Sequence, residues 1–331
     1  MKSLLFKYLS YNNKIQNTLY LAVILFGALS ILGDFTPYID GSIFFLFLLI
    51  TFGLIIAWEA LKKWLQYVDK KNEKNLVSAW EMISKREYDK ASQKLRNTEC
   101  LDHYKHRKIF LQAIIDYYQG EHKQSLSKLE SIEQPELLSD TFLLTFYEHK
   151  GYNLKELNRY DEAIEAFNLS IEGKDEIIPD NFVIYQHRGI CHHHLKCYEK
   201  ALSDFDKSIQ HKPIASTFHN KALSLFALNK LQSALEYFDR AIELNNREST
   251  FYYNRMQLHV QMKNWDTAIK DAEVLLSRNE YTDSAYYHRG LAKCHIGNRE
   301  DGLKDLSLIE DEELNIRAQK QIENINFKNI P

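Results

Sequence analysis

Small residues recur at fixed intervals along most of the chain and predict a repeated pair of helices. Successive members of the main series lie 33 to 38 residues apart, and a second series stands twelve residues before it. A small side chain on each of two antiparallel helices lets the backbones approach to about 8 Å, the short end of the usual range. The main series is Ala91, Ser125, Ala163, Ala201, Ala234, Ala268 and Gly302, and the second is Ala79, Ala113, Gly151, Gly189, Ala222, Met256 and Gly290.

Large apolar residues flank both series at a spacing of four. Tyr185 precedes Gly189 by four residues, and Phe205 follows Ala201 by four. This spacing places a large and a small side chain together on one face of a helix. Residues 312–325 form a further amphipathic segment. We expect it to be a helix that covers the exposed apolar face of the last pair.

These motifs are similar to those of the tetratricopeptide repeat (TPR) family. The resemblance implies an all-α fold, namely a right-handed α-solenoid of about seven helix pairs over residues 75–311, with a capping helix and tail at residues 312–331. Ser125 and Met256 depart from the family pattern, because the first replaces an alanine and the second a small contact residue. The segments that carry the resemblance are residues 160–167, 198–205, 231–238 and 265–272, and the closest units are residues 185–213, 218–246 and 286–290.

The first sixty residues follow a different pattern. Residues 18–33 and 42–58 contain no charged side chain, and with their flanks each approaches the ~30 Å of a bilayer's hydrocarbon core. We therefore predict a transmembrane helical hairpin before the repeats. The predicted organisation is an N-terminal segment at residues 1–14, the hairpin at 15–60 (helices at about 15–35 and 42–60), a basic juxtamembrane linker at 61–74, the solenoid at 75–311 and the cap and tail at 312–331.

Lysines stand on both outer flanks of the hairpin, whereas the connector between its two segments carries none. The positive-inside bias then predicts a multi-pass protein, in a bacterial inner membrane, with both termini and the repeats in the cytoplasm. Three other interpretations of the apolar segments remain open. The first segment is a cleaved signal peptide, the pair is a re-entrant or interfacial hairpin, or the pair is buried inside a soluble domain.

Composition excludes several classes of function. The net charge of −3 gives no basic footprint for nucleic acid. The 11 glycines never lie within two residues of one another, so the chain has no dinucleotide-binding turn and no nucleophile elbow. The four cysteines form no CxxC pair and suggest no disulfide framework. We expect no catalysis, no cofactor and no small-molecule substrate.

The TPR resemblance implies a concave groove that is lined by the first helix of each pair and binds a protein or peptide partner. The residues of this chain on that face are polar and mostly uncharged, and Asn220 and Asn254 offer amides to a peptide backbone. A solvated face without a ligand is the alternative. The candidate groove residues are His149, Tyr152, Gln186, His187, His193, His219, Asn220, Tyr253, Asn254, Gln257, Tyr287 and His288.

A series of cations accompanies the small residues of the first helices. We expect these cations to pair with carboxylates of the second helices such as Asp204, Asp271 and Asp305, although an anion-binding stripe is the alternative reading. The series is Lys150, Arg188, Lys221, Arg255 and Arg289.

One cluster has the residue types of a metal site. His187, Cys191 and His194 share one helix face at a spacing that suits zinc. We favour a buried thiol beside groove histidines, because no second ligand pair follows at the usual spacing.

The sequence as a whole predicts a membrane-anchored, non-catalytic TPR scaffold whose partners are a protein or peptide and the lipid bilayer. Anchoring would raise the local concentration of whatever the groove binds. The alternative is a subunit of an integral membrane complex, an immunity protein or an effector. In that alternative the hairpin is the active element and the repeats only position it.

Overall fold

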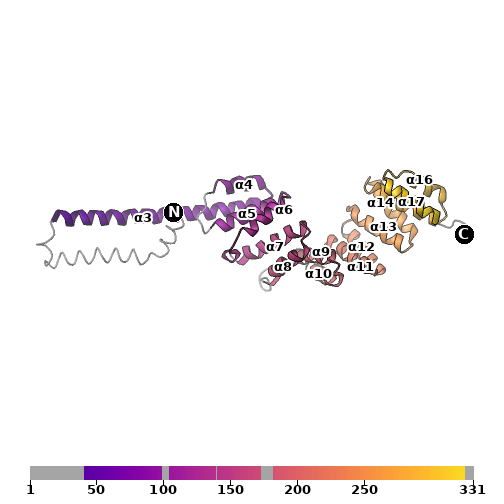
Figure 1. The fold of residues 1–331 in the computed structure, drawn as a ribbon, viewed down its shortest axis with the longest axis horizontal. Coiled ribbons are helices and arrows are strands. Elements are labelled where there is room, and N and C mark those ends of the chain that lie inside the picture. The colour runs from indigo at the N-terminus through magenta and orange to yellow at the C-terminus, as the bar shows by residue number, and fades with distance from the viewer. Residues whose placement is uncertain (1–40, 99–103, 139, 173–181, 325–331) are drawn as a thin grey trace. The chain divides into compact units, whose positions relative to one another are not determined.

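The computed structural model describes residues 41–98, 104–138, 140–172 and 182–324, and throughout these ranges the regular secondary structure is helical (Figure 1). This confirms the predicted all-α class. The helices are α3 (Gly41–Ser84), α4 (Tyr88–Arg96), α5 (Lys105–Tyr118), α6 (His122–Glu130), the 3₁₀ turn η2 (Pro135–Leu137), α7 (Asp140–Glu156), α8 (Tyr160–Glu172), α9 (Phe182–His194), α10 (Tyr198–His211), α11 (Ala215–Ala227), α12 (Leu231–Leu244), α13 (Ser249–Gln261), α14 (Trp265–Ser277), α15 (Thr282–His295), α16 (Arg299–Leu306) and α17 (Glu312–Asn324).

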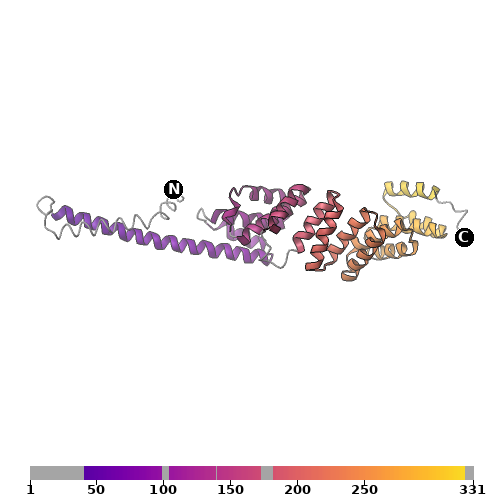
Figure 2. The ribbon, with the colours of Figure 1, turned by 90° about the horizontal axis from the view of Figure 1, so that it is seen from below.

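Consecutive helices pack as pairs, and the second helix of a pair also contacts the first helix of the next pair. The pairs α9–α10, α11–α12 and α13–α14 follow one another in this way (Figure 2). The chain divides into two compact units at residues 1–149 and 150–331, with the division inside α7. Each unit contains the same kind of pair. The predicted repeat solenoid is therefore confirmed.

The two helices of a pair approach most closely at the predicted small residues. A methyl group on Gly189 would stand 2.7 Å from the ring of Phe205, and one on Gly290 would stand 2.8 Å from the carbonyl oxygen of Gly302. Both distances are shorter than a carbon atom tolerates. The hydroxyl of Ser125 lies at the same level of its own pair and donates a 2.7 Å hydrogen bond to the carbonyl of Ala113.

The turn inside each pair contains one residue in the left-handed region, five positions before the small residue of the second helix. At Arg86 the two hydrogen bonds that close this turn are Arg86 N–H to Ile83 and Glu87 N–H to Met82, both at 2.9 Å. This is the Schellman arrangement, which glycine and asparagine adopt with least strain. The seven residues are Arg86, Gly120, Asn158, Lys196, Asn229, Lys263 and Gly297.

α3 is one unbroken helix of 44 residues. It includes the second predicted apolar segment (42–60), the predicted linker (61–74) and the first helix of the first pair. In that first helix Leu76, Ala79 and Ile83 are buried. Among the described residues, no helix combines the length and the apolarity that crossing a membrane requires. The first predicted apolar segment (15–35) lies outside the described residues.

α17 follows the last pair and packs against it. Ala318 is buried together with Leu291, Leu306 and Ile309, and Leu314 and Ile322 of α17 pack against the same cluster. The exposed apolar face of α15 and α16 is covered in this way. The tail after residue 324 lies outside the described residues.

Candidate functional site

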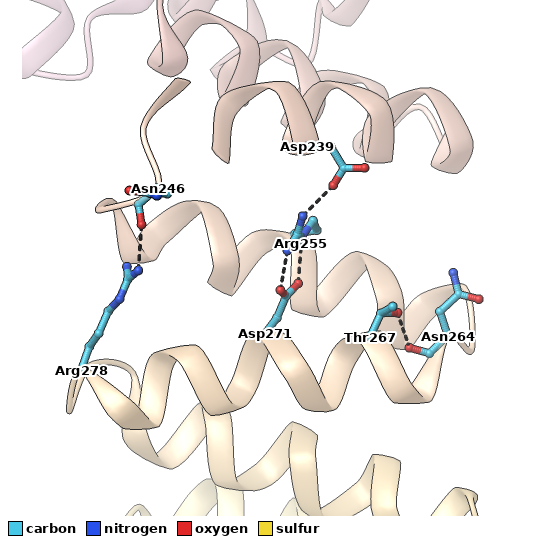
Figure 3. Close-up of polar contacts among 7 residues, drawn as sticks. All are labelled: Asp239, Asn246, Arg255, Asn264, Thr267, Asp271 and Arg278. Carbon is cyan, nitrogen blue, oxygen red and sulfur yellow. Dashed lines mark hydrogen bonds and ion pairs between the residues drawn. The ribbon is translucent and has the colours of Figure 1, made fainter. Parts of the chain in front are cut away.

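Three of the cations of the first helices, all arginines, are bound by carboxylates sixteen residues later, whereas Lys221 meets the hydroxyl of Tyr237 at that separation. Arg255 donates two hydrogen bonds to Asp271, of 2.9 and 2.6 Å (Figure 3). Arg188 binds Asp204 with the same two-bond geometry, and Arg289 binds Asp305 likewise. Asp204, Asp271 and Asp305 are all buried. The predicted pairing is confirmed for these three arginines, so their positive charge is neutralised inside the helix pair.

These cations also reach the preceding pair. Arg255 donates a third hydrogen bond, of 2.7 Å, to Asp239 on α12 (Figure 3). Arg188 donates one of 2.7 Å to Asn168 on α8, and Lys221 pairs with Asp206 on α10. Burial has the largest single effect on the pKa of Arg255 and lowers it, but the hydrogen bonds to Asp271 and Asp239 and the charges of these two aspartates together raise the pKa above its ordinary value. We call this recurring set of contacts the cation spine.

A separate contact joins the same two pairs at the turn between them. Arg278, at the end of α14, donates a 2.7 Å hydrogen bond to the carbonyl of Asn246 (Figure 3). The same guanidinium lies 4.9 Å from the ring centre of Tyr252. The turn between α12 and α13 is thereby fixed to α14.

The first helices α9, α11, α13 and α15 contact one another in sequence, so their side chains form one continuous face. Several predicted groove residues on this face are buried. Gln186 donates a 2.8 Å hydrogen bond to Ser216, and Nδ1 of His193 lies 2.8 Å from the Ser224 hydroxyl. Each of these bonds joins α9 to α11. The buried members of the predicted set are His149, Gln186, His219 and Tyr287.

Asn254 is half-buried, and its amide is already engaged within the protein. Its Nδ2 donates to Nε2 of His219 at 2.8 Å and to the carbonyl of Thr250 at 3.1 Å. These two bonds use both amide hydrogens, and the amide oxygen is left to accept a hydrogen bond from a ligand. Both donor and acceptor were expected from the sequence. With both hydrogens used, Asn254 can offer a ligand only its oxygen as an acceptor, and contact with a ligand stays a prediction.

The remaining predicted groove residues are half-buried: Tyr152, His187, His193, Asn220, Tyr253, Gln257 and His288. Tyr253 stacks on Tyr281 with ring centres 4.5 Å apart, and the Tyr281 hydroxyl lies 3.0 Å from that of Thr250. Tyr281 is exposed and has a left-handed backbone with φ 50°. Sequence reasoning missed it, because no local signal places a bulky aromatic residue in that conformation. Contact of this set with a ligand stays a prediction.

The residues of the metal hypothesis do not converge on one point. His187 lies against Tyr152 at 4.8 Å, whereas His194 stacks on Tyr160 at 4.6 Å. Cys191 is fully buried, and burial raises the pKa of its thiol to about 12. In the part of the chain that the structure describes, no group of three or more His, Cys, Asp or Glu residues could hold a metal ion.

Comparisons with known proteins support the repeat assignment. Residues 144–172 and 215–248 match the family model described as tetratricopeptide repeat. A tetratricopeptide repeat protein from Parabacteroides merdae has the same fold, with a TM-score of 0.52 at 19% identity, and the match covers 76% of this chain and 99% of that one.

Two curated relatives match shorter stretches. "Serine/threonine-protein phosphatase T" of Aspergillus oryzae is 33% identical over 101 residues, which are 30% of this chain and 20% of that protein. "Hsc70-interacting protein 1" of Drosophila melanogaster is 29% identical over 92 residues, which are 28% and 24% of the two chains. The chain spans between 20% and 30% of the length of the first curated relatives that it matches.

We expect Asp271→Leu to lower the free energy of unfolding by about 3 kcal/mol, because it leaves Arg255 partly buried beside a leucine. The double variant Arg255→Met/Asp271→Leu should recover most of that loss, since no buried charge is then left without its partner and Asp239, which also loses Arg255, is exposed to water. Arg240→Ala breaks an exposed pair with Glu243 and should change stability by less than about 0.5 kcal/mol. Urea unfolding followed by circular dichroism measures all three. Equal losses in the Asp271 and Arg240 variants would contradict a structural role for the cation spine.

Burial lowers the pKa of His187 to about 3, and its buried Nδ1 has no hydrogen-bond partner among the described residues. Because the pKa in the folded state lies below the unfolded value of 6.5, the stabilisation is complete above pH 6.5 and is lost as the pH falls toward 3. At pH 5 the loss from this residue is about 2 kcal/mol. His187→Phe should therefore flatten the decline in stability between pH 7 and pH 5, measured by urea unfolding at each pH, whereas His211→Gln on the exposed end of α10 should not.

Proposed function

We propose, on the premise that this chain is a TPR protein, that it is a non-catalytic scaffold for a protein or peptide partner. The partner binds on the face formed by α9, α11, α13 and α15. We propose further that the N-terminal segment attaches the scaffold to a membrane, with the repeats on the cytoplasmic side.

The observation that carries the first proposal is the neutral character of this face. The arginines of α9, α13 and α15 are bound to buried aspartates of the second helices, so their charges are not offered to a ligand. The half-buried members of the predicted groove set are aromatic rings, amides and imidazoles. Such groups bind a peptide through its backbone and its apolar side chains.

This chemistry favours an internal, uncharged peptide segment over a terminal carboxylate. Binding a carboxylate needs fixed cations, which form charge-assisted hydrogen bonds with it. Asn254 instead presents an amide oxygen, which accepts from a backbone N–H. Beside it, the stacked rings of Tyr253 and Tyr281 present an exposed aromatic surface. The similar Drosophila protein is named Hsc70-interacting protein 1, and the class of partner proposed for this chain is likewise a protein.

The test is site-specific photo-crosslinking in the full-length chain. A photoreactive amino acid at Tyr253 or Gln257 should form adducts with the partner, whereas the same group at Gln232 or Glu236 on the exposed side of α12 should not. Asn220→Ala/Asn254→Ala should reduce the adducts at Tyr253 roughly tenfold and leave helix content unchanged, because two peptide hydrogen bonds are lost. Adducts of equal yield on α12, or adducts that survive the double substitution, would sink the assignment of the face.

The membrane proposal is supported by the sequence of the first sixty residues. Residues 18–33 and 42–58 lack charged side chains, and lysines flank the pair on both outer sides. We expect the full-length chain to sediment with membranes without detergent. Leu25→Arg/Leu48→Arg should release it, since an arginine at the centre of a spanning helix costs about 3 kcal/mol. Phe6→Arg, outside the two apolar stretches, is the matched control. A wild-type chain that stays in the supernatant would refute attachment.

A further inference from the structure

One face of α3 combines lysines with large exposed apolar side chains. Its members recur at spacings of three and four, which places them in one line along the helix. The exposed fractions are 55% for Ile56, 53% for Trp64 and 64% for Tyr67, which are high values for such residues. We call this line the α3 stripe: Ile56, Ala60, Lys63, Trp64, Tyr67, Lys70, Lys71 and Lys74.

The opposite face of α3 packs in the core of the first helix pair. Asn72, Leu76, Ala79 and Ile83 are buried, and they too follow one another at spacings of three and four. Leu76, Ala79 and Ile83 belong to the apolar core that α3 shares with α4 and α5. Because the helix is continuous, this periodicity fixes the direction of the stripe. The stripe faces away from the first pair.

The carboxylates of this part of α3 lie off the stripe. Asp69 and Glu73 lie near Tyr104. Burial is the main cause that raises the pKa of Tyr104 to about 12, and the negative charges of these two carboxylates raise it further. Within the stripe, the ammonium of Lys71 lies 6.0 Å from the ring centre of Tyr67. The stripe therefore holds four lysines and no acidic residue. Glu59 and Glu73 flank the stripe, four residues before Lys63 and three after Lys70, so they reduce its net charge, which stays positive.

We propose that the α3 stripe binds the anionic headgroups of a phospholipid surface. Lysines are attracted to that surface, and tryptophan and tyrosine settle at the level between headgroups and acyl chains. A soluble polyanion would pair with the lysines but would give Trp64 and Tyr67 no apolar partner. The proposal rests on the membrane attachment proposed above. Because α3 is unbroken, the whole stripe reaches the headgroups only when α3 lies along the membrane surface, so the proposal adds this orientation, the class of lipid and the face that recognises it.

The continuity of α3 gives this binding a mechanical consequence. Between Trp64 and Leu76 the helix rises roughly 18 Å at 1.5 Å per residue. In Figures 1 and 2 the first half of α3 extends beyond the helices α4 to α6 of its own unit. A stripe held at the headgroups therefore holds the first helix pair at a fixed rotation about the α3 axis. A flexible linker at residues 61–74 would not do this.

The test uses the full-length chain reconstituted in vesicles whose acyl chains carry bromine, which quenches nearby tryptophan. The vesicles are made of phosphatidylcholine alone or of phosphatidylcholine with phosphatidylglycerol. The contribution of Trp64 is the difference between the wild type and Trp64→Phe. We expect Trp64 to be quenched at least twofold more in the anionic vesicles, and the excess to disappear at high salt, where exposed charges are screened.

The matched variants remove four lysines each. Lys63→Gln/Lys70→Gln/Lys71→Gln/Lys74→Gln should abolish the excess quenching. The control Lys123→Gln/Lys200→Gln/Lys230→Gln/Lys270→Gln removes the same charge from exposed positions on other helices and should retain the excess. Circular dichroism of both variants checks that the helices are intact.

The outcomes separate this proposal from membrane attachment. Flotation with both kinds of vesicle but equal quenching of Trp64 in both would overturn the role of the α3 stripe and leave attachment standing. Flotation with anionic vesicles only, with excess quenching, would support the stripe and refute the hairpin. Binding of the stripe to soluble polyglutamate without any quenching by brominated lipid would assign it to an acidic protein and overturn the proposal.

Discussion

Close contact between the two helices of each pair is the constraint on which the rest of the structure depends. At Gly189 a single added methyl group would enter the ring of Phe205, and at Gly290 it would press on the backbone of the partner helix. Because the two helices are antiparallel and joined by a short turn, a residue of the first helix meets the residue sixteen positions later on the second, as Gly189 meets Phe205. Arg188, Arg255 and Arg289 likewise bind aspartates that lie sixteen residues later in the chain.

The cation spine determines which chemical groups remain available to a partner on the face of the first helices. Each arginine donates two hydrogen bonds to one aspartate, and Arg255 donates a third to a second aspartate in the preceding pair. Pairs of this kind contribute little net stability relative to apolar residues of the same volume, but breaking one is costly. They therefore favour one register between consecutive pairs. They also remove the cations from the face that would otherwise bind anions, and the remaining chemistry is that of amides and aromatic rings.

The two proposed binding surfaces differ in their charge, and in both cases the position of the carboxylates decides it. The face of α9, α11, α13 and α15 is neutral because its cations have carboxylate partners inside the repeats. The α3 stripe is positive because the carboxylates of that helix lie outside it, and two of them, Asp69 and Glu73, lie near Tyr104. A neutral surface suits a peptide backbone, and a positive surface with tryptophan and tyrosine suits anionic lipid.

The sequence by itself determined the helix pairs, their period and their points of closest contact, since these depend on local spacing and on side-chain size. It also predicted the pairing of Arg188, Arg255 and Arg289, because residues sixteen apart meet once two helices pack antiparallel. It did not reveal that Gln186 and His219 are buried or that Tyr281 stacks on Tyr253. It also did not reveal that Asn254 donates both of its amide hydrogens to groups within the protein. Nor did it show that residues 61–74 continue one helix into the first pair. These features depend on contacts between neighbouring pairs and on the direction in which each helix face points, and only the tertiary structure decides those.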